Sequence, residues 1–247
     1  MIRNAIFDIL DLLKLSGIKK SFDDILSNGK KHNDSIEKII LDLLTAEKSS
    51  KESKSIAYKM RQSNIPYRKE IDDFDFSFGT VKKSNIDNLC DGSFLENKNN
   101  IVFIGGSGTG KTHLAIGIGL KLIRKGYKIR YFNLVDLTND LEREWNNGND
   151  KVFINKIIKN NCLIFDELGY LPFSSNGANL LFNLLSKCYE QTSLIITTNL
   201  VFSEWNQLFN NVKLTNALLD RLTHHCEIIE TGDKSWRLHE RNLNNDK

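Results

Sequence analysis

Residues 101–115 of this 247-residue chain read Ile101-Val102-Phe103-Ile104-Gly105-Gly106-Ser107-Gly108-Thr109-Gly110-Lys111-Thr112-His113-Leu114-Ala115. The four apolar residues at the start predict a buried strand, and the apolar spacing after Lys111 predicts a helix. Between them lies Gly-x-x-x-x-Gly-Lys-Thr, the signature of a phosphate-binding loop. A strand before the signature and a helix after it are its proper context, so a glycine-rich turn that binds nothing is a much weaker interpretation.

Each residue type in this loop has a physical role in binding phosphate. Glycines adopt backbone conformations closed to other residues, so successive N–H groups point at one anion, and the helix dipole adds to the attraction. Lys111 reaches the outer phosphates, and the Thr112 hydroxyl is a ligand for Mg²⁺. We therefore predict ATP and Mg²⁺ as cofactors. The predicted nucleotide contacts are Gly105, Gly106, Ser107, Gly108, Thr109, Gly110, Lys111, Thr112 and His113, with Arg237 from a later segment.

Composition and charge are those of a soluble globular protein. Hydrophobic residues make up 40% of the chain and charged residues 26%, and the formal net charge is only +3, so charge alone does not require a nucleic-acid partner. No apolar run approaches the roughly 18 residues of a membrane span, and the N-terminus is not a secretory signal. The cysteines at 90, 162, 188 and 226 are scattered, as in reduced proteins, so we expect a cytoplasmic location.

Five predicted strands alternate with predicted helices along the second half of the chain. This alternation predicts an α/β fold, a parallel five-stranded sheet with helices on both faces. The predicted strands are 101–104, 128–132, 161–167, 193–199 and 227–230, and the predicted helices of this part include 134–145, 150–159, 177–189 and 214–221. We expect a helical N-terminal domain at 1–70, a connector at 71–98 and the nucleotide-binding domain at 99–247.

The N-terminal part is predicted to be helical over residues 1–20 and again after the capping pattern at 34–37, with Pro66 ending the second helix. Residues 48–69 are rich in lysine and arginine, which fits either a solvated helix face or an arm that contacts DNA phosphates. In the connector, Phe74, Phe76 and Phe78 alternate with acidic residues. We interpret it as a strap that packs its aromatic rings on the core and leads to the nucleotide site.

Polar residues follow two of the predicted strands, at the sheet edge where parallel α/β proteins bind ligands. Asp166 fits the acid that holds Mg²⁺ in nucleotide hydrolases, and Glu167 is placed to orient an attacking water. Asn199 ends the next strand, where its amide can bond the γ-phosphate or the water. Thr198 is a weaker candidate for that role, and a turn-forming Asn is the alternative.

Two arginines near the C-terminus are candidates for completing the site. Arg221 can reach the γ-phosphate of a neighbouring subunit, and the alternative is an ion pair with Asp220 or Glu227. Arg237 can contact phosphates of its own or of a neighbouring chain. The pair His224-His225 has no acidic or cysteine partners at metal-ligand spacing, so we interpret it as packing or interface.

Four motifs together resemble the IstB family of ATP-binding helper proteins of insertion-sequence transposition, close to the DnaC helicase loaders within the AAA+ ATPases. The motifs are residues 106–115, Phe165–Phe173, Ile195–Leu200 with Phe202–Trp205, and Leu219–His225. The resemblance covers nearly the whole chain and implies ATP-dependent homo-oligomers on double-stranded DNA that present a target to a transposase. Two departures are Gly106-Ser107, where a proline-containing pair is usual, and Val201, where proline is frequent.

Three other functions share parts of this pattern. A replicative helicase loader shares every motif, although the Glu-Leu-Gly-Tyr-Leu-Pro-Phe stretch at 167–173 favours transposition. A small-molecule kinase shares the phosphate loop but needs an arginine-rich lid, and none occurs between Asp166 and Asn199. A nucleotide-gated scaffold without hydrolysis requires Glu167 to be idle. An integrase-type transposase encoded immediately upstream favours transposition over helicase loading, and phosphate release without an acceptor excludes the kinase.

Overall fold

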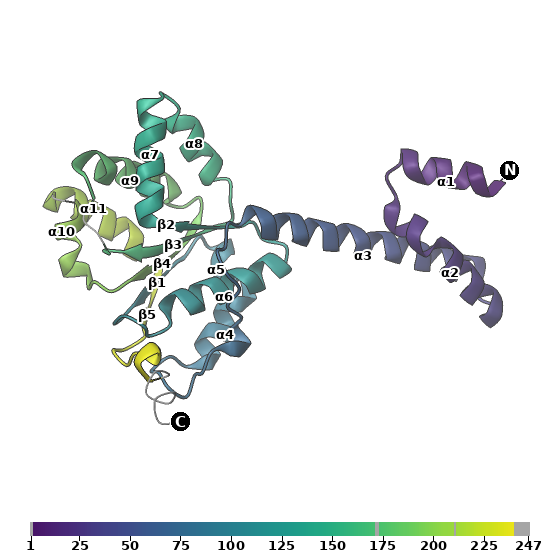
Figure 1. Ribbon diagram of the computed structural model, residues 1–247, viewed down its shortest axis with the longest axis horizontal. Coiled ribbons are helices and arrows are strands. Elements are labelled where there is room, and N and C mark those ends of the chain that lie inside the picture. Colours follow the sequence, from purple (N-terminus) through teal and green to yellow (C-terminus); the bar gives the residue numbers. More distant parts are fainter. Residues whose placement is uncertain (1, 171–172, 210, 240–247) are drawn as a thin grey trace. The chain divides into compact units, whose positions relative to one another are not determined.

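The computed structural model describes residues 2–170, 173–209 and 211–239 (Figure 1). The chain forms two compact units, residues 1–58 and 59–247. The three-part division at residues 70 and 98 concerns function and stays a prediction. Among the described residues, no helix combines the length and the apolar character that crossing a membrane requires.

The second unit is built on a parallel sheet of five strands in the order β2-β3-β4-β1-β5, which confirms the predicted fold class. The central strands are buried on both faces, as parallel strands covered by helices are. The strands are β1 Asn100–Ile104, β2 Ile129–Asn133, β3 Cys162–Leu168, β4 Ser193–Thr198 and β5 Cys226–Glu230.

Helices cover both faces of the sheet (Figure 1). On one face, α6 crosses four of the strands and α4 packs on it. On the other face, α7 contacts β2 and β3 and packs on α8 and α9, and α10 and α11 contact α9. The helices are α4 Lys83–Asp91, α5 Ser93–Glu96, α6 Lys111–Arg124, α7 Leu134–Asn146, α8 Asp150–Ile157, α9 Ser175–Cys188, α10 Asn206–Phe209 and α11 Val212–Thr223, with short 3₁₀ turns η1 Ile71–Asp73 and η2 Phe202–Glu204.

The connector differs from the expected irregular strap, because α4 and α5 lie within it. Helix α4 buries Ile86 and Leu89 against the core, and Gly92 ends it in the left-handed conformation with φ 86°. The sequence carries this apolar spacing, but the polar residues around it conceal a helix of nine residues. The aromatic half of the connector, residues 74–78, has no helix or strand, as expected.

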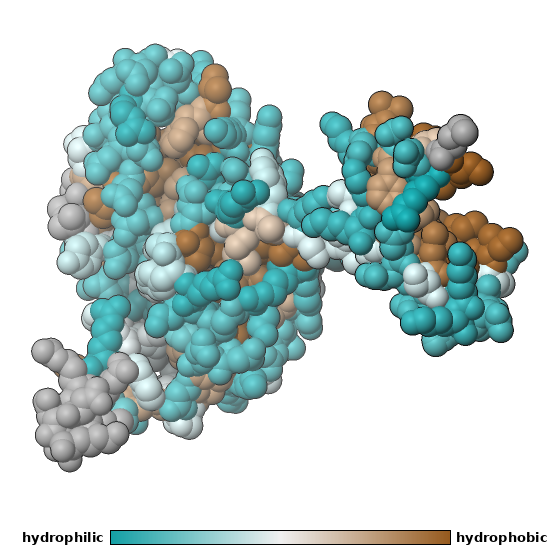
Figure 2. Space-filling view, turned by 45° about the vertical axis from the view of Figure 1, so that its right-hand side comes forward, coloured by the Kyte–Doolittle hydropathy of each residue, from teal (hydrophilic) through white to brown (hydrophobic). Residues whose placement is uncertain are grey.

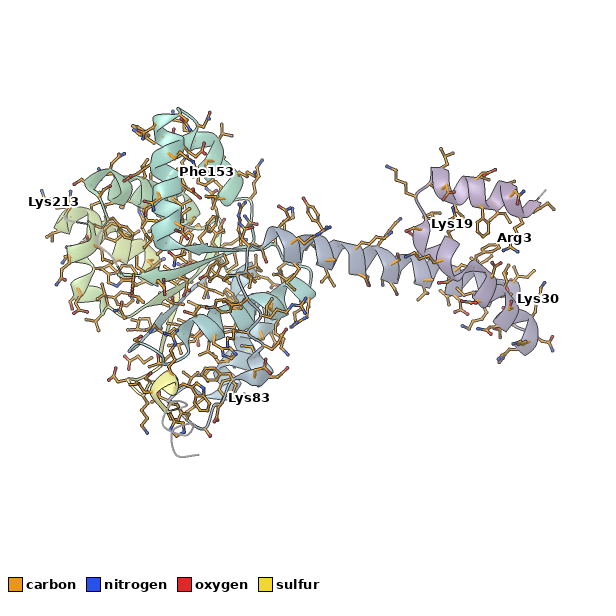
Figure 3. All side chains as sticks on the ribbon, viewed as in Figure 1. Arg3, Lys19, Lys30, Lys83, Phe153 and Lys213 are labelled. Carbon is orange, nitrogen blue, oxygen red and sulfur yellow. The ribbon has the colours of Figure 1, made fainter. Side chains whose placement is uncertain are left out.

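The N-terminal unit contains α1 Ile2–Leu12, α2 Ser16–His32 and the start of α3 Ile36–Gln62. The single helix expected over 1–20 is wrong, since Lys14 adopts the left-handed conformation with φ 55° and the chain turns there. Helix α3 ends four residues before Pro66. Arg3 and Lys19 both lie over the ring of Phe7, which contacts Phe22 edge-to-face (Figure 3).

A buried carboxylate joins α2 to α3. Glu47 of α3 is only 5% exposed, and its Oε2 accepts the N–H groups of Gly17 and Ile18 at 2.6 and 3.0 Å. These N–H groups lie in the first turn of α2, where the helix offers no acceptor of its own. Burial raises the pKa of Glu47, but the two N–H donors and the Lys51 ammonium outweigh it and hold the pKa below its ordinary value.

We expect Glu47→Ala to loosen the N-terminal unit, because two amides of α2 lose their acceptor. Hydrogen exchange of the full chain should become at least severalfold faster in peptides that cover the start of α2. The matched control is Glu52→Ala, which removes an exposed carboxylate paired with Lys48 from the same helix. Because the folded pKa is lowered, the contact is complete above the ordinary carboxyl pKa and is lost as the pH falls through the lowered value. Equal exchange in both variants would contradict this role.

The same unit leaves large apolar side chains that its own helices do not cover (Figure 2). They lie on α1 and on the first half of α3: Ile2, Ile9, Leu12, Leu13, Ile36, Ile40, Leu41 and Leu44. Within the unit, Leu10 and Ile18 are the buried large apolar residues. So small a core contributes little stability by itself.

Candidate functional site

The phosphate loop connects the buried end of β1 to the first turn of α6. Gly108 and Gly110 have φ angles of 79° and 92°, which side chains other than glycine rarely adopt. Among the described residues, no acceptor takes the backbone N–H groups of residues 108–113. These N–H groups and the start of α6 therefore form the anion site that the sequence predicts.

A cavity of about 500 Å³ opens over this loop. Its volume lies in the range of nucleotide- and ligand-sized pockets. The cavity is lined by Tyr67, Arg68, Lys69, Asp73, Phe74, Asp75, Phe78, Gly79, residues 108–113, Lys234, Trp236 and Arg237. Basic side chains outnumber acidic ones in this lining, which favours an anionic ligand. Arg68 and Lys69, which the sequence assigns to the possible DNA arm, lie at the nucleotide cavity instead.

Lys111 donates to the carbonyl oxygens of Gly105 and Gly106, both at 2.7 Å. Burial lowers the pKa of Lys111, and the Arg237 guanidinium lowers it further against the opposing effect of Asp166. A bound phosphate would offer Lys111 a charged acceptor in place of the two carbonyls.

The segment after β5 braces the loop, which the sequence pattern does not reveal. Thr231 donates its N–H to the Ile104 carbonyl and shares a hydrogen bond of 2.6 Å with the Thr109 hydroxyl. Trp236 donates its N–H to the Gly108 carbonyl at 3.0 Å, and Ser235 packs where a side chain at position 108 would lie. This brace places Arg237 at the cavity of its own chain.

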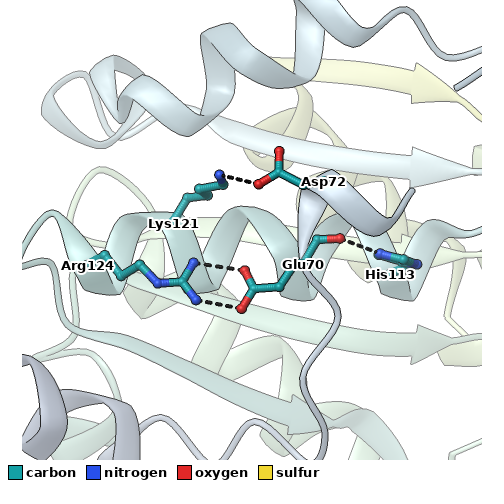
Figure 4. Close-up of polar contacts among 5 residues, drawn as sticks. All are labelled: Glu70, Asp72, His113, Lys121 and Arg124. Carbon is teal, nitrogen blue, oxygen red and sulfur yellow. Dashed lines mark hydrogen bonds and ion pairs between the residues drawn. The ribbon is translucent and has the colours of Figure 1, made fainter. Parts of the chain in front are cut away.

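The strap is fastened to α6 at both ends of the helix (Figure 4). The Glu70 carboxylate pairs with Arg124 through two hydrogen bonds of 2.8 and 2.5 Å, and Asp72 pairs with Lys121 at 3.0 Å. His113 bonds the Glu70 carbonyl through Nε2 at 2.7 Å and meets Phe74 edge-to-face. His113 therefore faces the strap as well as lining the cavity.

The aromatic strap lies against the loop, as the sequence predicts. The Phe74 ring fills the space beside Gly110 so tightly that a side chain at position 110 would collide with it. Phe78 meets Trp236 edge-to-face with 5.0 Å between ring centroids. Strap and C-terminal segment thus close the cavity from two sides.

Asp166 lies at the carboxyl end of β3, 3% exposed, and its two oxygens accept from different strands and loops. Oδ1 accepts from Thr112 at 2.8 Å and from Thr197 at 2.5 Å, and Oδ2 accepts from Tyr131 at 2.7 Å. Burial raises the pKa of the Tyr131 phenol, and its bond to Asp166 adds to the shift, so the phenol stays a donor.

Thr112 and Asp166 fit a Mg²⁺ ion. Both present oxygen, the ligand type that Mg²⁺ prefers, and their oxygens lie 2.8 Å apart. Adjacent ligands of an octahedral ion with Mg–O of about 2.0–2.1 Å lie about 2.9 Å apart. The donor pair that the sequence predicts is therefore brought together at a compatible separation.

Glu167 follows Asp166 in a left-handed conformation with φ 65°, which is uncommon for a residue with a side chain. The strand pairing shifts register between Phe165 and Leu168 at this point. The Glu167 N–H donates to the Thr197 hydroxyl at 3.0 Å, and its Oε2 accepts the Asn133 amide at 2.7 Å. This backbone turn brings two successive carboxylates to the same end of the sheet.

Thr197 and Asn133 are site residues that sequence reasoning missed. Thr197 is 1% exposed and links the backbone of Glu167 to the carboxylate of Asp166. The predicted residue on this strand, Asn199, is exposed and lies beside Gly169. Thr198 instead donates to the Leu168 carbonyl and accepts the Leu200 N–H, which stabilises the turn. The roles assigned to Asn199 stay a prediction.

The two candidate arginines lie at different places. Arg237 lines the cavity together with Lys111. Arg221 is exposed in the last turn of α11, beside Asn100 at the start of β1, and so lies at the opposite edge of the sheet from its own phosphate loop. Among the described residues, Arg221 forms no ion pair with Asp220 or Glu227.

Residues 9–244 match the family described as IstB-like ATP binding protein. A Geobacillus stearothermophilus protein, named as an ATP-binding protein of insertion sequence IS5376, is 39% identical over 217 residues, which are 87% of this chain and 86% of that protein. The corresponding protein of insertion sequence IS232 from Bacillus thuringiensis subsp. berliner is 34% identical, over 93% of this chain and 92% of its own length.

Two solved structures show the same fold. DnaI matches 66% of this chain and 91% of its own at a TM-score of 0.56 and 17% identity. DnaA from Aquifex aeolicus bound to AMPPCP matches 66% of this chain and 50% of its own at a TM-score of 0.55 and 16% identity. The second unit therefore has the AAA+ fold.

Proposed function

Since this chain belongs to the family of IstB-like ATP-binding proteins, we propose that it is an AAA+ ATPase that binds ATP with Mg²⁺ in the cavity described above and hydrolyses it to ADP and phosphate. The observation that carries the proposal is a loop of free N–H groups facing the same cavity as Lys111, with Asp166 hydrogen-bonded to Thr112. The relatives' names, which describe ATP-binding proteins, agree with it.

Each part of the site has a task in this mechanism. The loop N–H groups and Lys111 bind the phosphates, and Thr112 and Asp166 hold Mg²⁺, which neutralises charge on them. Glu167 accepts a hydrogen bond from the attacking water and orients it toward the γ-phosphate, while the Asn133 amide fixes the carboxylate. Asn199 bonds the water or the γ-phosphate, and Arg237 contacts phosphate from within the same chain.

We further propose that ATP-bound chains form homo-oligomers on double-stranded DNA and present target DNA to a transposase. The support is the insertion-sequence origin of the relatives and the position of Arg221, which is at the wrong edge of the sheet to serve its own loop. A replicative helicase loader remains the second candidate, because DnaI shares the fold. A transposase that binds this protein in the presence of ATP and DNA would separate the two.

The nucleotide site is tested by Lys111→Ala. The substitution removes the cation that faces the outer phosphates, and we expect ATP affinity to fall by at least about tenfold, as when a hydrogen bond to a charged group worth about 1.5–3 kcal/mol is lost. Titration of a fluorescent ATP analogue measures it. The control is Lys125→Ala, at the far end of the same helix. Unchanged affinity in Lys111→Ala would remove the loop from the account.

DNA binding should be largely independent of sequence and should weaken steeply with salt, because phosphate contacts release counterions. If the first half of the lysine-rich stretch is the arm, exchanging Lys48, Lys54 and Lys59 for Gln lowers the slope of log affinity against log salt by about one per lost contact. Fluorescence anisotropy with duplexes at several salt concentrations measures the slope. The same exchange at Lys98, Lys187 and Lys213 is the control, and equal slopes for both triple variants would exclude the arm.

A further inference from the structure

The Asp166 carboxylate is held asymmetrically by its neighbours. Two hydroxyls, those of Thr112 and Thr197, bond Oδ1, whereas one hydroxyl, that of Tyr131, bonds Oδ2. An aspartate carboxylate has a soft terminal torsion, so it turns easily unless its oxygens are fixed. The bond from Tyr131 fixes the second oxygen and thereby keeps Oδ1 turned toward Thr112.

Tyr131 is itself held firmly at the edge of the sheet. Its backbone pairs with Ile164 of β3 on one side, and on the other its N–H donates to the carbonyl of Ser63 at 2.7 Å. Ser63 is fully buried and bonds the Met60 carbonyl through its hydroxyl. The phenol is therefore presented to Asp166 from a backbone anchored on both sides.

We propose that Tyr131 is a positioning residue for Mg²⁺, acting through Asp166, and this inference rests on the proposed function. Tyr131 does not touch the ion. It orients the carboxylate so that the oxygen beside Thr112 is presented as a ligand. Residues that orient metal ligands in this way typically change metal affinity by about 10–100-fold when they are substituted.

The test is Tyr131→Phe, which removes only the hydroxyl. Affinity for a fluorescent, non-hydrolysable ATP analogue is measured without Mg²⁺ and across a Mg²⁺ titration. We expect unchanged affinity without Mg²⁺ and a Mg²⁺ half-saturation that rises about 10–100-fold. At saturating Mg²⁺ the hydrolysis rate should approach that of the wild type. The matched control is Tyr127→Phe, four residues earlier, whose ring packs near Gly92 away from the site.

A double-mutant cycle with Asp166→Asn separates positioning from a general loss of structure. In the Asp166→Asn background, Tyr131→Phe should cause no further rise in Mg²⁺ half-saturation. A full additional rise there, or wild-type Mg²⁺ dependence in the single variant, would overturn the inference while leaving the ATP site intact. A wild-type protein that binds no nucleotide, or binds it without response to Mg²⁺, would instead overturn the proposed function.

Discussion

Arg221→Ala should bind ATP as the wild type does and hydrolyse it about 10³–10⁵-fold more slowly, the range by which arginine fingers accelerate phosphoryl transfer. Arg221 is exposed at the amino-terminal edge of the sheet, whereas the phosphate loop lies at the carboxyl-terminal edge, so its guanidinium acts only on a neighbouring chain. A guanidinium remains charged and bonds two phosphate oxygens at once, which a Lys does less well. Phosphate release at saturating ATP and DNA measures the loss.

A mixing experiment separates a contribution across the interface from damage within one chain. Arg221→Ala keeps its phosphate loop and Lys111→Ala keeps its arginine, so oligomers that contain both should recover part of the activity. Lys213→Ala, which removes a cation from the first turn of the same helix (Figure 3), should hydrolyse ATP normally. No recovery at any ratio, with mixed oligomers shown to form, would mean that Arg221 does not act on a neighbour.

Glu167→Gln is expected to retain ATP binding and to lose hydrolysis by roughly a hundredfold or more, within the range for acid–base groups. The amide keeps the size of the side chain, but it removes the negative charge that orients the attacking water. Equilibrium binding of ATP and the rate of phosphate release, measured on the same preparation, separate the two effects.

The control for this variant is the same exchange at Glu190, which is exposed just after α9 and away from the cavity. Glu190→Gln should bind and hydrolyse ATP as the wild type does. If Glu167→Gln turns over at the wild-type rate, another group must activate the water. A loss of ATP binding in Glu167→Gln would show instead that the substitution disturbs the loop.

The sequence predicts the sheet and the phosphate loop because both depend on local patterns. A buried strand such as β3 needs only a short apolar run, and the loop needs its glycines and Lys111 at fixed spacing. The contacts of the Asp166 carboxylate depend instead on the sheet order, since β2 and β4 flank β3 and deliver Tyr131 and Thr197. Nothing in either strand's own pattern marks these hydroxyls as site residues.

The missed elements have physical reasons of the same kind. Helix α4 is short and polar at its flanks, so its apolar face becomes recognisable only where it packs on α6. The turn at Lys14 interrupts an apolar spacing that would otherwise continue the first helix. The brace from Thr231 and Trp236 to the loop joins segments more than 120 residues apart, which no local pattern encodes.

The most direct test of ATP hydrolysis at this site is phosphate release by the wild-type protein with ATP, Mg²⁺ and double-stranded DNA, with no phosphoryl acceptor other than water, beside Lys111→Ala. The account predicts equal amounts of ADP and phosphate from the wild type, a rate that rises with DNA, and no release from Lys111→Ala. Wild-type protein that binds ATP yet releases no more phosphate than Lys111→Ala, with or without DNA, would contradict it.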